Sequence, residues 1–440
     1  MARITVIGAG SMGFTRGLVR DVLTFPSLAD ATISLMDVNP ERLDFAYRAV
    51  KRIVELGGYP AKVEATLDRA EAVKDADAVL CTILAGDVSV WQHDILIPKK
   101  YGIDTNIGDT RSVSGIFRAL RTIPVMLDFA ADVEAVCPDA WFLNYVNPMA
   151  MITGAMLQGT DVRTVGLCHS VQGCAWWLLK QLGMIDSVKK LQWKIAGINH
   201  QGWLLEITDG GKDLYPEIRR RAAKMNAEAR KPGAKKHWDM VRFEIMRHFG
   251  YYVTESSEHS SEYMPYWIKK THPELIAEFN IPLDEYPRRC IAQIRGWKKQ
   301  RDEIVKNKQL GHTRTHEYGS YIMEAMETDV PFRIGGNVLN TGLITNLPAK
   351  ACVEVPCMVD RGGVHGCCVG DLPEQCAAMN RTNINVQLLT IEAALTRKKD
   401  RIYQAAMMDP HTGAELTLDE IRGLCDDLIQ AHGNMLPEYD

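Results

Sequence analysis

The stretch Arg3–Gly13, RITVIGAGSMG, decides the fold of this 440-residue chain. Its first five residues are rich in β-branched side chains, which favour a strand, and apolar residues at helical spacing follow the last glycine. The three glycines match the pattern G-x-G-x-x-G between a strand and a helix, which is typical of dinucleotide-binding folds. The sequence therefore predicts a strand, a tight turn and a helix that together hold a pyrophosphate.

Each residue of this turn has an expected physical task. We predict that Gly8 permits the sharp turn, that Gly10 lets a pyrophosphate approach the backbone, and that Gly13 lets helix and strand pack closely. Ser11 and Met12 stand at the helix N-terminus, where unpaired backbone N–H groups can bind phosphate oxygens.

An acidic residue follows the second expected strand. The strand Thr32–Met36 ends at Asp37, and a helix from Pro40 toward Leu56 comes next. A carboxylate at this place accepts hydrogen bonds from the ribose 2′-OH and repels a 2′-phosphate. Asp37 therefore favours NAD+ over NADP+ as the cofactor.

The first part of the chain alternates expected strands with expected helices, which predicts a parallel sheet covered on both faces. Further strands are expected at 78–83, 140–145 and 162–167, and a long helix at 116–136. Past about residue 195 the pattern changes to two antiparallel strands at 193–199 and 204–209, charged helices within 215–249, short strands at 338–345 and 352–359, and a helical region at 375–408.

We therefore expect an α/β protein with two domains. Residues 1–195 should form a Rossmann domain that binds NAD+. Residues 196–440 should form a mixed, largely helical domain for substrate binding and oligomerisation, in an arrangement like that of lactate dehydrogenases.

Composition excludes several classes of protein. Lys and Arg number 51 against 55 Asp and Glu, a net charge of −4, which is too balanced for binding nucleic acid through its phosphates. No stretch approaches the ~20 apolar residues of a membrane-spanning helix. The 11 cysteines are odd in number and contain no C-x-x-C pair, so reduced thiols are expected. We expect a cytoplasmic protein with a small-molecule partner.

A thiol and an imidazole follow two of the expected strands. Cys168 comes directly after the strand at 162–167, where open α/β sheets place their ligands, and His200 ends the strand at 193–199. A thiolate and an imidazole can share a divalent transition metal and leave positions for substrate oxygens. Core packing of both side chains is the alternative interpretation.

A 2-hydroxy-acid dehydrogenase is the first competing interpretation, because such enzymes share the dinucleotide fold and also carry a histidine near this point. Their substrate-binding arginine stands in a D-x-x-R segment. Residues 155–185 contain no such segment, and Cys168-His169 stands there instead.

Four motifs in order resemble glycoside hydrolase family 4 nearly end to end, and the segment Cys168–Val171, together with two later segments, most resembles the branch that contains α-galactosidases. They are Gly8–Ser11, Asn144–Pro148, Leu167–Ser170 and Ala196–His200, joined in that branch by Glu255–His259 and Glu262–Pro265. The resemblance implies NAD+ and a divalent metal, usually Mn²⁺, as cofactors. It also implies hydrolysis by oxidation at the sugar C3, proton removal at C2, elimination of the C1 substituent, addition of water and re-reduction.

The resemblance assigns roles to five residues. Cys168 and His200 fall on the metal-ligand positions of the family, and Asn147 falls on its substrate-binding asparagine. His169 stands where phospho-glycosidase members carry an acidic proton donor, which implies a general acid of altered type, with support of the metal site as its other role. Tyr263 aligns with the tyrosine base of some members, and a phenol needs a nearby cation or metal to serve in this way.

The identity of the base stays open, because another branch uses an aspartate in a D-R-H motif where this chain has Ser257-Glu258-His259. Glu258 and His259 are the fallback candidates, and a solvated loop is the other interpretation of this segment. Asp109 precedes an expected helix and contacts either a sugar hydroxyl or the helix N-terminus. Trp91, Trp203 and Trp267 are expected to pack in the core (all).

Several alternatives remain open on sequence alone. An α-glucuronidase or α-galacturonidase of the same family would pair its substrate carboxylate with Arg288 or Arg289. An NAD-binding sensor would bind the cofactor without turnover, and a net-oxidising dehydrogenase would accumulate NADH. From the family we expect a homodimer or a homotetramer that acts on a small sugar.

Overall fold

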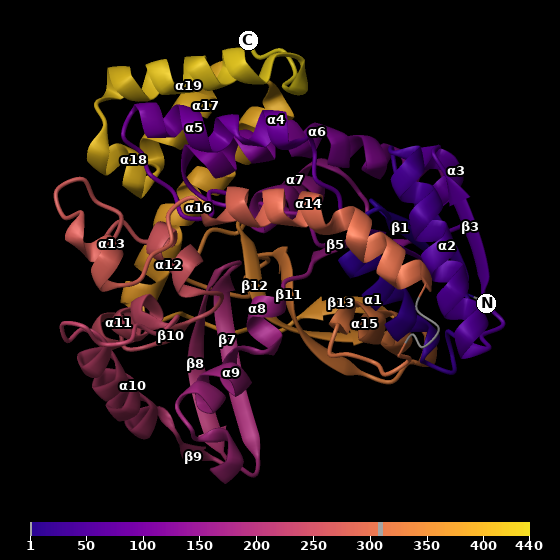
Figure 1. The fold of residues 1–440 in the computed structure, drawn as a ribbon, viewed down its shortest axis with the longest axis horizontal. Coiled ribbons are helices and arrows are strands. Elements are labelled where there is room, and N and C mark those ends of the chain that lie inside the picture. The colour runs from indigo at the N-terminus through magenta and orange to yellow at the C-terminus, as the bar shows by residue number, and fades with distance from the viewer. Residues whose placement is uncertain (1, 307–310) are drawn as a thin grey trace.

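One sheet runs through the molecule in this computed structural model, which describes residues 2–306 and 311–440 (Figure 1). Its N-terminal strands pair in parallel in the order β3-β2-β1-β4-β5-β6, which is the order of the doubly wound dinucleotide-binding fold. They are β1 (Arg3–Ile7), β2 (Thr32–Met36), β3 (Lys62–Thr66), β4 (Ala78–Cys81), β5 (Trp141–Asn144) and β6 (Thr164–Gly166). The predicted Rossmann arrangement is confirmed.

The sheet continues beyond β6 into antiparallel strands in the order β11-β12-β7-β8-β10. These are β7 (Leu191–Ile198), β8 (Gln201–Asp209), β10 (Tyr252–Val253), β11 (Phe332–Leu339) and β12 (Cys352–Asp360), with the short β9 (Lys212–Asp213) and β13 (Gly363–Gly366) at their sides. The hairpin β11–β12 is joined narrowly to both neighbours. One residue pair, Asn337 with Gly166, connects β11 to β6, and one pair, Glu354 with Gly197, connects β12 to β7.

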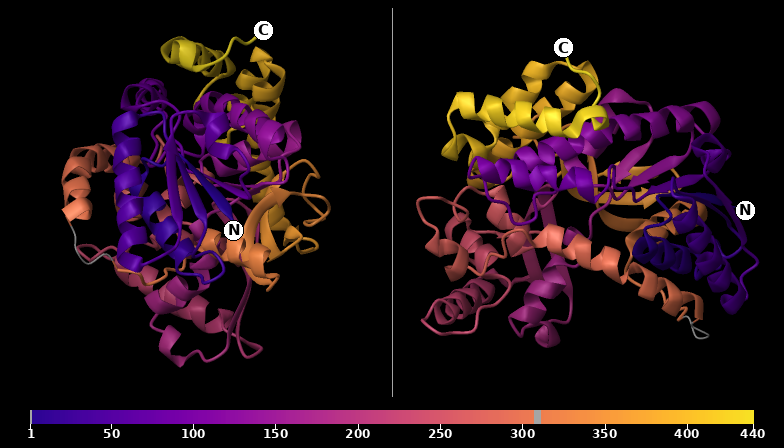
Figure 2. Two further views of the ribbon diagram at one scale, coloured as in Figure 1. Left: turned by 90° about the vertical axis from the view of Figure 1, so that its right-hand side faces the viewer. Right: turned by 45° about the horizontal axis from the view of Figure 1, so that its top comes forward.

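Side chains alternate along β1, so this strand contributes to two cores. Ile4 and Val6 lie in one core with Leu18 of α1, and Ile7 lies in the other with Phe117 of α6. Helices therefore cover both faces of the parallel strands (Figure 2). The helices of this half are α1 (Met12–Leu23), α2 (Pro40–Gly57), α3 (Arg69–Val73), α4 (Val88–Trp91), α5 (His93–Lys100), α6 (Ser112–Val136), α7 (Met149–Gly159), α8 (His169–Gln172) and α9 (Cys174–Gln181), followed by a 3₁₀ turn, Ile185–Ser187.

The C-terminal helices return to the N-terminal half, where α19 packs on α5 and α17 on α6 (yellow in Figure 1). A buried group ties them there, because the Asp94 carboxylate accepts from Arg121 Nη1 at 2.9 Å and contacts His432 Nε2 of α19 at 3.0 Å. The helices after β8 are α10 (Tyr215–Ala229), α11 (Met240–Phe249), α12 (Ser257–Tyr263), α13 (Glu274–Glu278), α14 (Glu285–Lys306), α15 (Tyr318–Thr328), α16 (Glu374–Thr396), α17 (Lys399–Met408), α18 (Pro410–Glu415) and α19 (Leu418–His432), with a last 3₁₀ turn, Gly433–Met435.

Some expected elements differ from the observed ones. The helical region expected at 375–408 is two helices, α16 and α17, because Arg397 adopts a left-handed conformation (φ 62°) between them. The strand expected at 338–345 begins earlier, at Phe332, and ends at Leu339. Strand β3 and the helices α14 and α19 were not expected. Across the described ranges, none of the helices has the length and apolar character that spanning a membrane requires.

Candidate active site

The glycine-rich turn lies at the carboxyl end of β1, as the sequence predicts. Gly8 has φ +80°, in the left-handed region that favours glycine, and its N–H donates to Met36 O at 2.9 Å. Gly10 donates its N–H to Asp37 Oδ2 at 2.9 Å, and a Cβ at Gly10 would come within 2.7 Å of that oxygen. The second glycine therefore lets the Asp37 carboxylate reach the turn.

One expectation for this turn is wrong. A Cβ at Gly13 would meet no atom of the described residues within 4 Å, so Gly13 borders open space and is not needed for close packing of helix on strand. At the start of α1, the Ser11 side chain makes no capping hydrogen bond within the described part of the chain. Met12 is the first residue of this helix, whose N-terminal N–H groups are the donors expected for phosphate.

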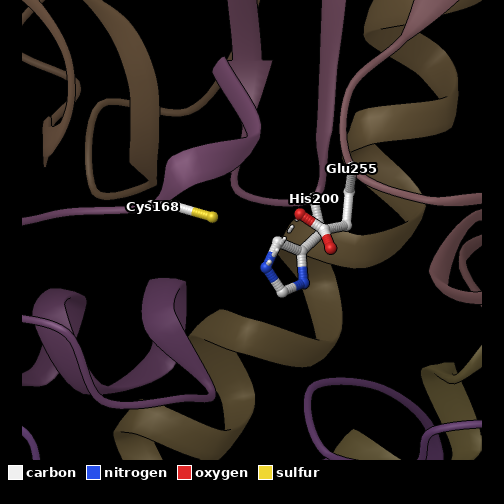
Figure 3. A group of neighbouring side chains, drawn as sticks. All are labelled: Cys168, His200 and Glu255. Carbon is white, nitrogen blue, oxygen red and sulfur yellow. Dashed lines mark ion pairs between the residues drawn. The ribbon is translucent and has the colours of Figure 1, made fainter. Parts of the chain in front are cut away.

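Cys168 and His200 converge from different strands (Figure 3). Cys168 follows β6 and begins α8, while His200 stands in the turn between β7 and β8 with φ 62°. Glu255, two residues after the end of β10, joins them. One ligand atom from each of the three side chains lies within 4.8 Å of the others. The predicted pairing of a thiol and an imidazole is thus accompanied by a carboxylate.

Burial and neighbouring charges set the ionisation of this cluster. Burial raises the pKa of the Cys168 thiol to about 12, and the nearby Glu255 and Glu354 carboxylates add to the effect. Burial also opposes ionisation of Glu255, but His200, His259 and Arg242 outweigh it and hold the pKa of Glu255 below its usual value. A thiol next to a carboxylate suits a divalent cation, whose binding displaces the thiol proton.

His169 contacts Glu317, the N-cap residue of α15. Its Nε2 contacts the Glu317 carboxylate, which also accepts from Tyr145 Oη at 2.7 Å. The hydrogen bond to Glu317 raises the pKa of His169 above its usual value, against partial burial. The ring centroid of His169 lies 6.0 Å from that of Phe14, on α1 just after the glycine-rich turn. His169 therefore lies near the start of α1, which follows the glycine-rich turn.

Asp109 does not cap a helix. The N-cap of α6 is Arg111, and the Asp109 carboxylate accepts from Asn147 Nδ2 at 3.3 Å and lies 3.4 Å from His259 Nε2. Burial opposes ionisation of Asp109, but the His259 and Arg118 cations more than offset it, so its pKa lies well below the usual range. Asp109, Asn147 and His259 thus form one polar group of charged and amide side chains.

Tyr263, the last residue of α12, is buried beside His200, with ring centroids 6.1 Å apart. The Arg111 guanidinium carbon lies 5.6 Å from the Tyr263 ring centre, and Arg111 pairs with Asp409 at 2.8 Å. Burial raises the pKa of the phenol, while Thr110 and the Arg111 charge oppose this rise.

The segment that supplies the fallback bases is not a solvated loop. Glu258 and His259 lie in helix α12, the His259 side chain is only 11% exposed, and Glu258 lies 3.9 Å from Arg289. The solvated-loop interpretation of this segment is therefore wrong. The expected packing of three tryptophans is confirmed, because each is buried: Trp91, Trp203 and Trp267.

Sequence reasoning missed three carboxylates of the site: Glu255, Glu317 and Glu354. Glu354 lies on β12, accepts from Asn337 Nδ2 at 3.1 Å, and has its pKa raised to about 7 by burial. Only Glu255 had a signal, because it opens the segment Glu255–His259 that carries the resemblance. Glu317 and Glu354 lie far from every motif along the chain and reach the site only through the fold.

Glu262 holds the loop that leads to Asp109. Its Oε1 accepts backbone N–H groups of three successive residues at 2.5, 2.7 and 3.1 Å: Asn106, Ile107 and Gly108. Glu262→Gln is expected to lower the free energy of unfolding by about 2 kcal/mol, because charge-assisted hydrogen bonds to a buried acceptor are lost. Urea denaturation checks this value, with the exposed Glu274→Gln as the control. Equal stability of the two variants would contradict the role of Glu262.

Two family models together cover most of the chain. The model of the family 4 glycosyl hydrolases matches residues 3–184, and the model of their C-terminal domain matches residues 195–412. An α-galactosidase of Bacillus subtilis is 54% identical over the full length of both chains. An α-galactosidase of Rhizobium meliloti is 36% identical over 99% of this chain and 89% of its own.

Solved structures share the fold at low sequence identity. A 6-phospho-α-glucosidase from gut microorganisms in complex with NAD and Mn²⁺ superposes with a TM-score of 0.80 at 20% identity, with all of both chains covered. A 6-phospho-β-glucosidase of Thermotoga maritima with manganese, NAD⁺ and glucose-6-phosphate gives a TM-score of 0.79 at 21% identity, again with all of both chains covered. With both family models matched in order along it, the chain belongs to the family 4 glycosyl hydrolases.

Proposed function

We propose that this protein is an NAD+- and Mn²⁺-dependent α-galactosidase. It hydrolyses α-galactosides by oxidation at C3, proton removal at C2, elimination, addition of water and re-reduction. The observation that carries the proposal is the convergence of Cys168 and His200 with Glu255 within 4.8 Å. The identity of 54% to an α-galactosidase over the full length supports the choice of substrate.

The donor atoms of the cluster fit a divalent ion. Sulfur, imidazole nitrogen and carboxylate oxygen together suit a transition metal, and one such atom from each side chain lies within 4.8 Å of the others. Cys168 and His200 would hold the ion. When bound, such an ion acts as a Lewis acid on sugar oxygens.

The turn after β1 fits a dinucleotide. Gly8, Gly10, Ser11, Met12 and Gly13 would bind its pyrophosphate, and open space beside Gly13 leaves room for it. When bound, NAD+ accepts a hydride from the sugar and later returns it. Each oxygen of the carboxylate group that follows β2 accepts one backbone N–H at 2.9 Å. These hydrogen bonds orient the carboxylate toward the glycine-rich turn, where the ribose would lie. That carboxylate, Asp37, favours NAD+ over NADP+.

Two side chains would act as the general acid and the base of the reaction. The Glu317 carboxylate raises the pKa of His169 by stabilising its imidazolium, and His169 would protonate the leaving oxygen as general acid. Tyr263 removes the C2 proton as base. Its phenol is disfavoured as an anion by burial, and Arg111 supplies a neighbouring positive charge that stabilises the anion.

Asn147 and Asp109 bind the sugar. Their side chains share a hydrogen bond of 3.3 Å, so an amide and a carboxylate stand together to hold hydroxyl groups. The ionised state of Asp109 makes it an acceptor only, and Asn147 supplies both donor and acceptor atoms. This pair orients the ring without taking part in proton transfer.

A neutral sugar suits the site better than a uronide. The two guanidinium groups that would recognise a uronide are exposed on α14 and both pair with Glu285, at 2.7 Å from Arg288 and 2.9 Å from Arg289. A substrate carboxylate would have to displace this existing partner. We therefore retain α-glucuronides and α-galacturonides only as the comparison substrates of the test.

The proposal extends to organisation and location. Residues 1–195 bind NAD+, and residues 196–440, which begin within β7, bind substrate and mediate oligomerisation as a homodimer or homotetramer. We place the enzyme in the cytoplasm, where NAD+ is available and thiols such as Cys168 stay reduced.

A substrate panel tests the proposal. Aryl α-galactoside, α-glucuronide and α-galacturonide are assayed with and without NAD+ and Mn²⁺, and we expect hydrolysis of the galactoside only when both cofactors are present. NADH that accumulates in proportion to product would instead identify a dehydrogenase. Cofactor binding without hydrolysis of any substrate would identify a sensor.

Hydrolysis in D₂O gives a second, sharper prediction. We expect the galactose product to carry deuterium at C2, because the proton removed there exchanges with solvent before water adds. NMR of the product measures this label. An unlabelled C2 would contradict the elimination route, since a displacement assisted by two carboxylates leaves that carbon untouched.

A further inference from the structure

Glu255 stands beside Cys168 and His200 without an assigned task. Its Oε2 lies 3.9 Å from His200 Nε2, which is too long for a hydrogen bond but suits two atoms that share a cation. The side chain is 23% exposed and the His200 side chain is 4% exposed, so the carboxylate faces the cluster from its more open side. Figure 3 shows the carboxylate and the imidazole turned toward one another, with the thiol on the same side.

The backbone of Glu255 is held in an unfavourable conformation. Its φ is 71°, in the left-handed region, which non-glycine residues adopt rarely and only where their surroundings impose it. Because φ sets the direction of the Cα–Cβ bond, this conformation decides where the carboxylate points. An ordinary extended residue here would direct its side chain elsewhere.

A buried arginine of α11 contacts the chain at this position and two residues further on. Arg242 donates from Nη1 to the carbonyl oxygen of Glu255, and its backbone N–H donates to Ser257 Oγ at 3.3 Å. Its guanidinium carbon lies near two aromatic rings, 4.7 Å from the centre of the Trp238 ring and 4.6 Å from that of Tyr252.

The guanidinium group is itself fixed by a buried carboxylate. Arg242 Nε pairs with Asp239, whose other oxygen accepts from Tyr252 Oη at 2.6 Å. The side chains of the pair are only 4% and 0% exposed. The donor to the Glu255 carbonyl is therefore held in place, since its charge is paired and two aromatic rings lie beside it.

We propose that Glu255 is a third protein ligand of the divalent ion and that Arg242 is the positioning residue that holds it there. This inference rests on the metal requirement of the proposed function. A thiolate and a carboxylate together neutralise a divalent cation, and a carboxylate oxygen favours a hard ion such as Mn²⁺. Three ligands leave further positions of the ion open for substrate oxygens.

Manganese binding without substrate or NAD+ tests the ligand. Free Mn²⁺ is measured by electron paramagnetic resonance during titration of the metal-free protein. We expect Glu255→Gln to weaken binding by more than ~30-fold, because loss of a direct ligand costs at least as much as loss of an outer partner. Glu258→Gln is the matched control, because it removes a carboxylate three residues away that lies near Arg289, 3.9 Å distant. We expect it to change the affinity less than ~3-fold.

The outcomes separate this inference from the proposed function. If the unaltered protein binds no Mn²⁺, the proposed function fails. If it binds Mn²⁺ and Glu255→Gln binds it as tightly as Glu258→Gln does, only the third ligand is refuted. A Co²⁺-loaded sample gives an independent signal, because loss of a ligand changes the visible absorption bands, whereas a carboxylate that merely orients His259 leaves them unchanged.

Arg242→Lys tests the positioning role. Lysine carries a single ammonium nitrogen, which cannot pair with Asp239 and reach the Glu255 carbonyl together, so we expect about 10-fold weaker Mn²⁺ binding with an unchanged Co²⁺ spectrum. In the double variant with Glu255→Gln, the substitution at 242 should have no further effect, because it acts only through Glu255. An additive effect would overturn that role. If the Arg242→Lys variant does not fold, Mn²⁺ binding by the Glu255→Gln variant, which alters a partly exposed side chain, still tests whether Glu255 is a ligand.

Discussion

Cys168→Ser is expected to weaken Mn²⁺ binding by more than about 100-fold and to remove nearly all turnover, because loss of even an outer partner of a metal ligand costs about 10–100-fold. A hydroxyl group has a much higher pKa than a thiol and does not supply the anionic ligand. Burial already raises the pKa of the Cys168 thiol to about 12, so binding of the ion must displace its proton.

Titration of metal-free protein with Mn²⁺, followed by an assay on an aryl α-galactoside, measures both effects. Cys368→Ser is the matched control, because Cys368 is an exposed thiol that stands outside the cluster. We expect the control to match the unaltered protein. Full activity of Cys168→Ser in rigorously metal-free buffer would contradict both the ligand and the metal requirement.

Gly10→Ala is expected to weaken NAD+ binding by about 100-fold, since overpacking of a tight contact costs ~1–3 kcal/mol. The added Cβ would lie 2.7 Å from Asp37 Oδ2 and 2.7 Å from Arg42 Cβ. Both atoms must move, and the hydrogen bond between Gly10 N–H and the Asp37 carboxylate is lost. Because each turnover uses the cofactor, hydrolysis should fall with cofactor occupancy.

Calorimetric titration with NAD+ checks this prediction, and excess NAD+ should restore part of the activity. Gly17→Ala is the control on the same helix, because a Cβ at Gly17 meets no atom of the described residues within 4 Å. Gly13→Ala is equally free of protein contacts. It should therefore fold normally and lose NAD+ affinity only if the cofactor passes over it, so unchanged affinity would place the pyrophosphate elsewhere.

The parallel half of the fold was predictable because local signals and fold agree there. Strand β1, the glycine-rich turn and Asp37 lie within one short stretch, where hydrophobic pattern and turn chemistry point to the same structure. Helix α14 was not predictable in this way. It is highly charged and contains Pro287 and Gly296, and it packs on α2 through the contact of Trp297 with Phe45, centroids 5.9 Å apart. Its stability comes from a tertiary contact rather than from an amphipathic pattern.

The residues of the site that directly follow strands could be predicted from the sequence. Cys168 and His200 follow strands, so the sequence places both at one edge of the sheet. Glu317 was out of reach, because it comes from the start of α15 and meets His169 across 148 residues of chain. The gap reflects a general limit, since carboxylates that act through tertiary contacts leave no periodic signal in the sequence.

The hairpin β11–β12 contributes no residue to the proposed metal site, but it sets the distance between the strands β6 and β7. It separates β6 from β7, so the strands that carry Cys168 and His200 lie three strand spacings apart, or ~14 Å between axes. Among the described strands, the ladder joins the hairpin to each of its two neighbours by a single residue pair, at Asn337 and at Glu354. A shift of its register by one residue would therefore pull the thiol and the imidazole out of reach of a common ion, even with every residue of the site unchanged.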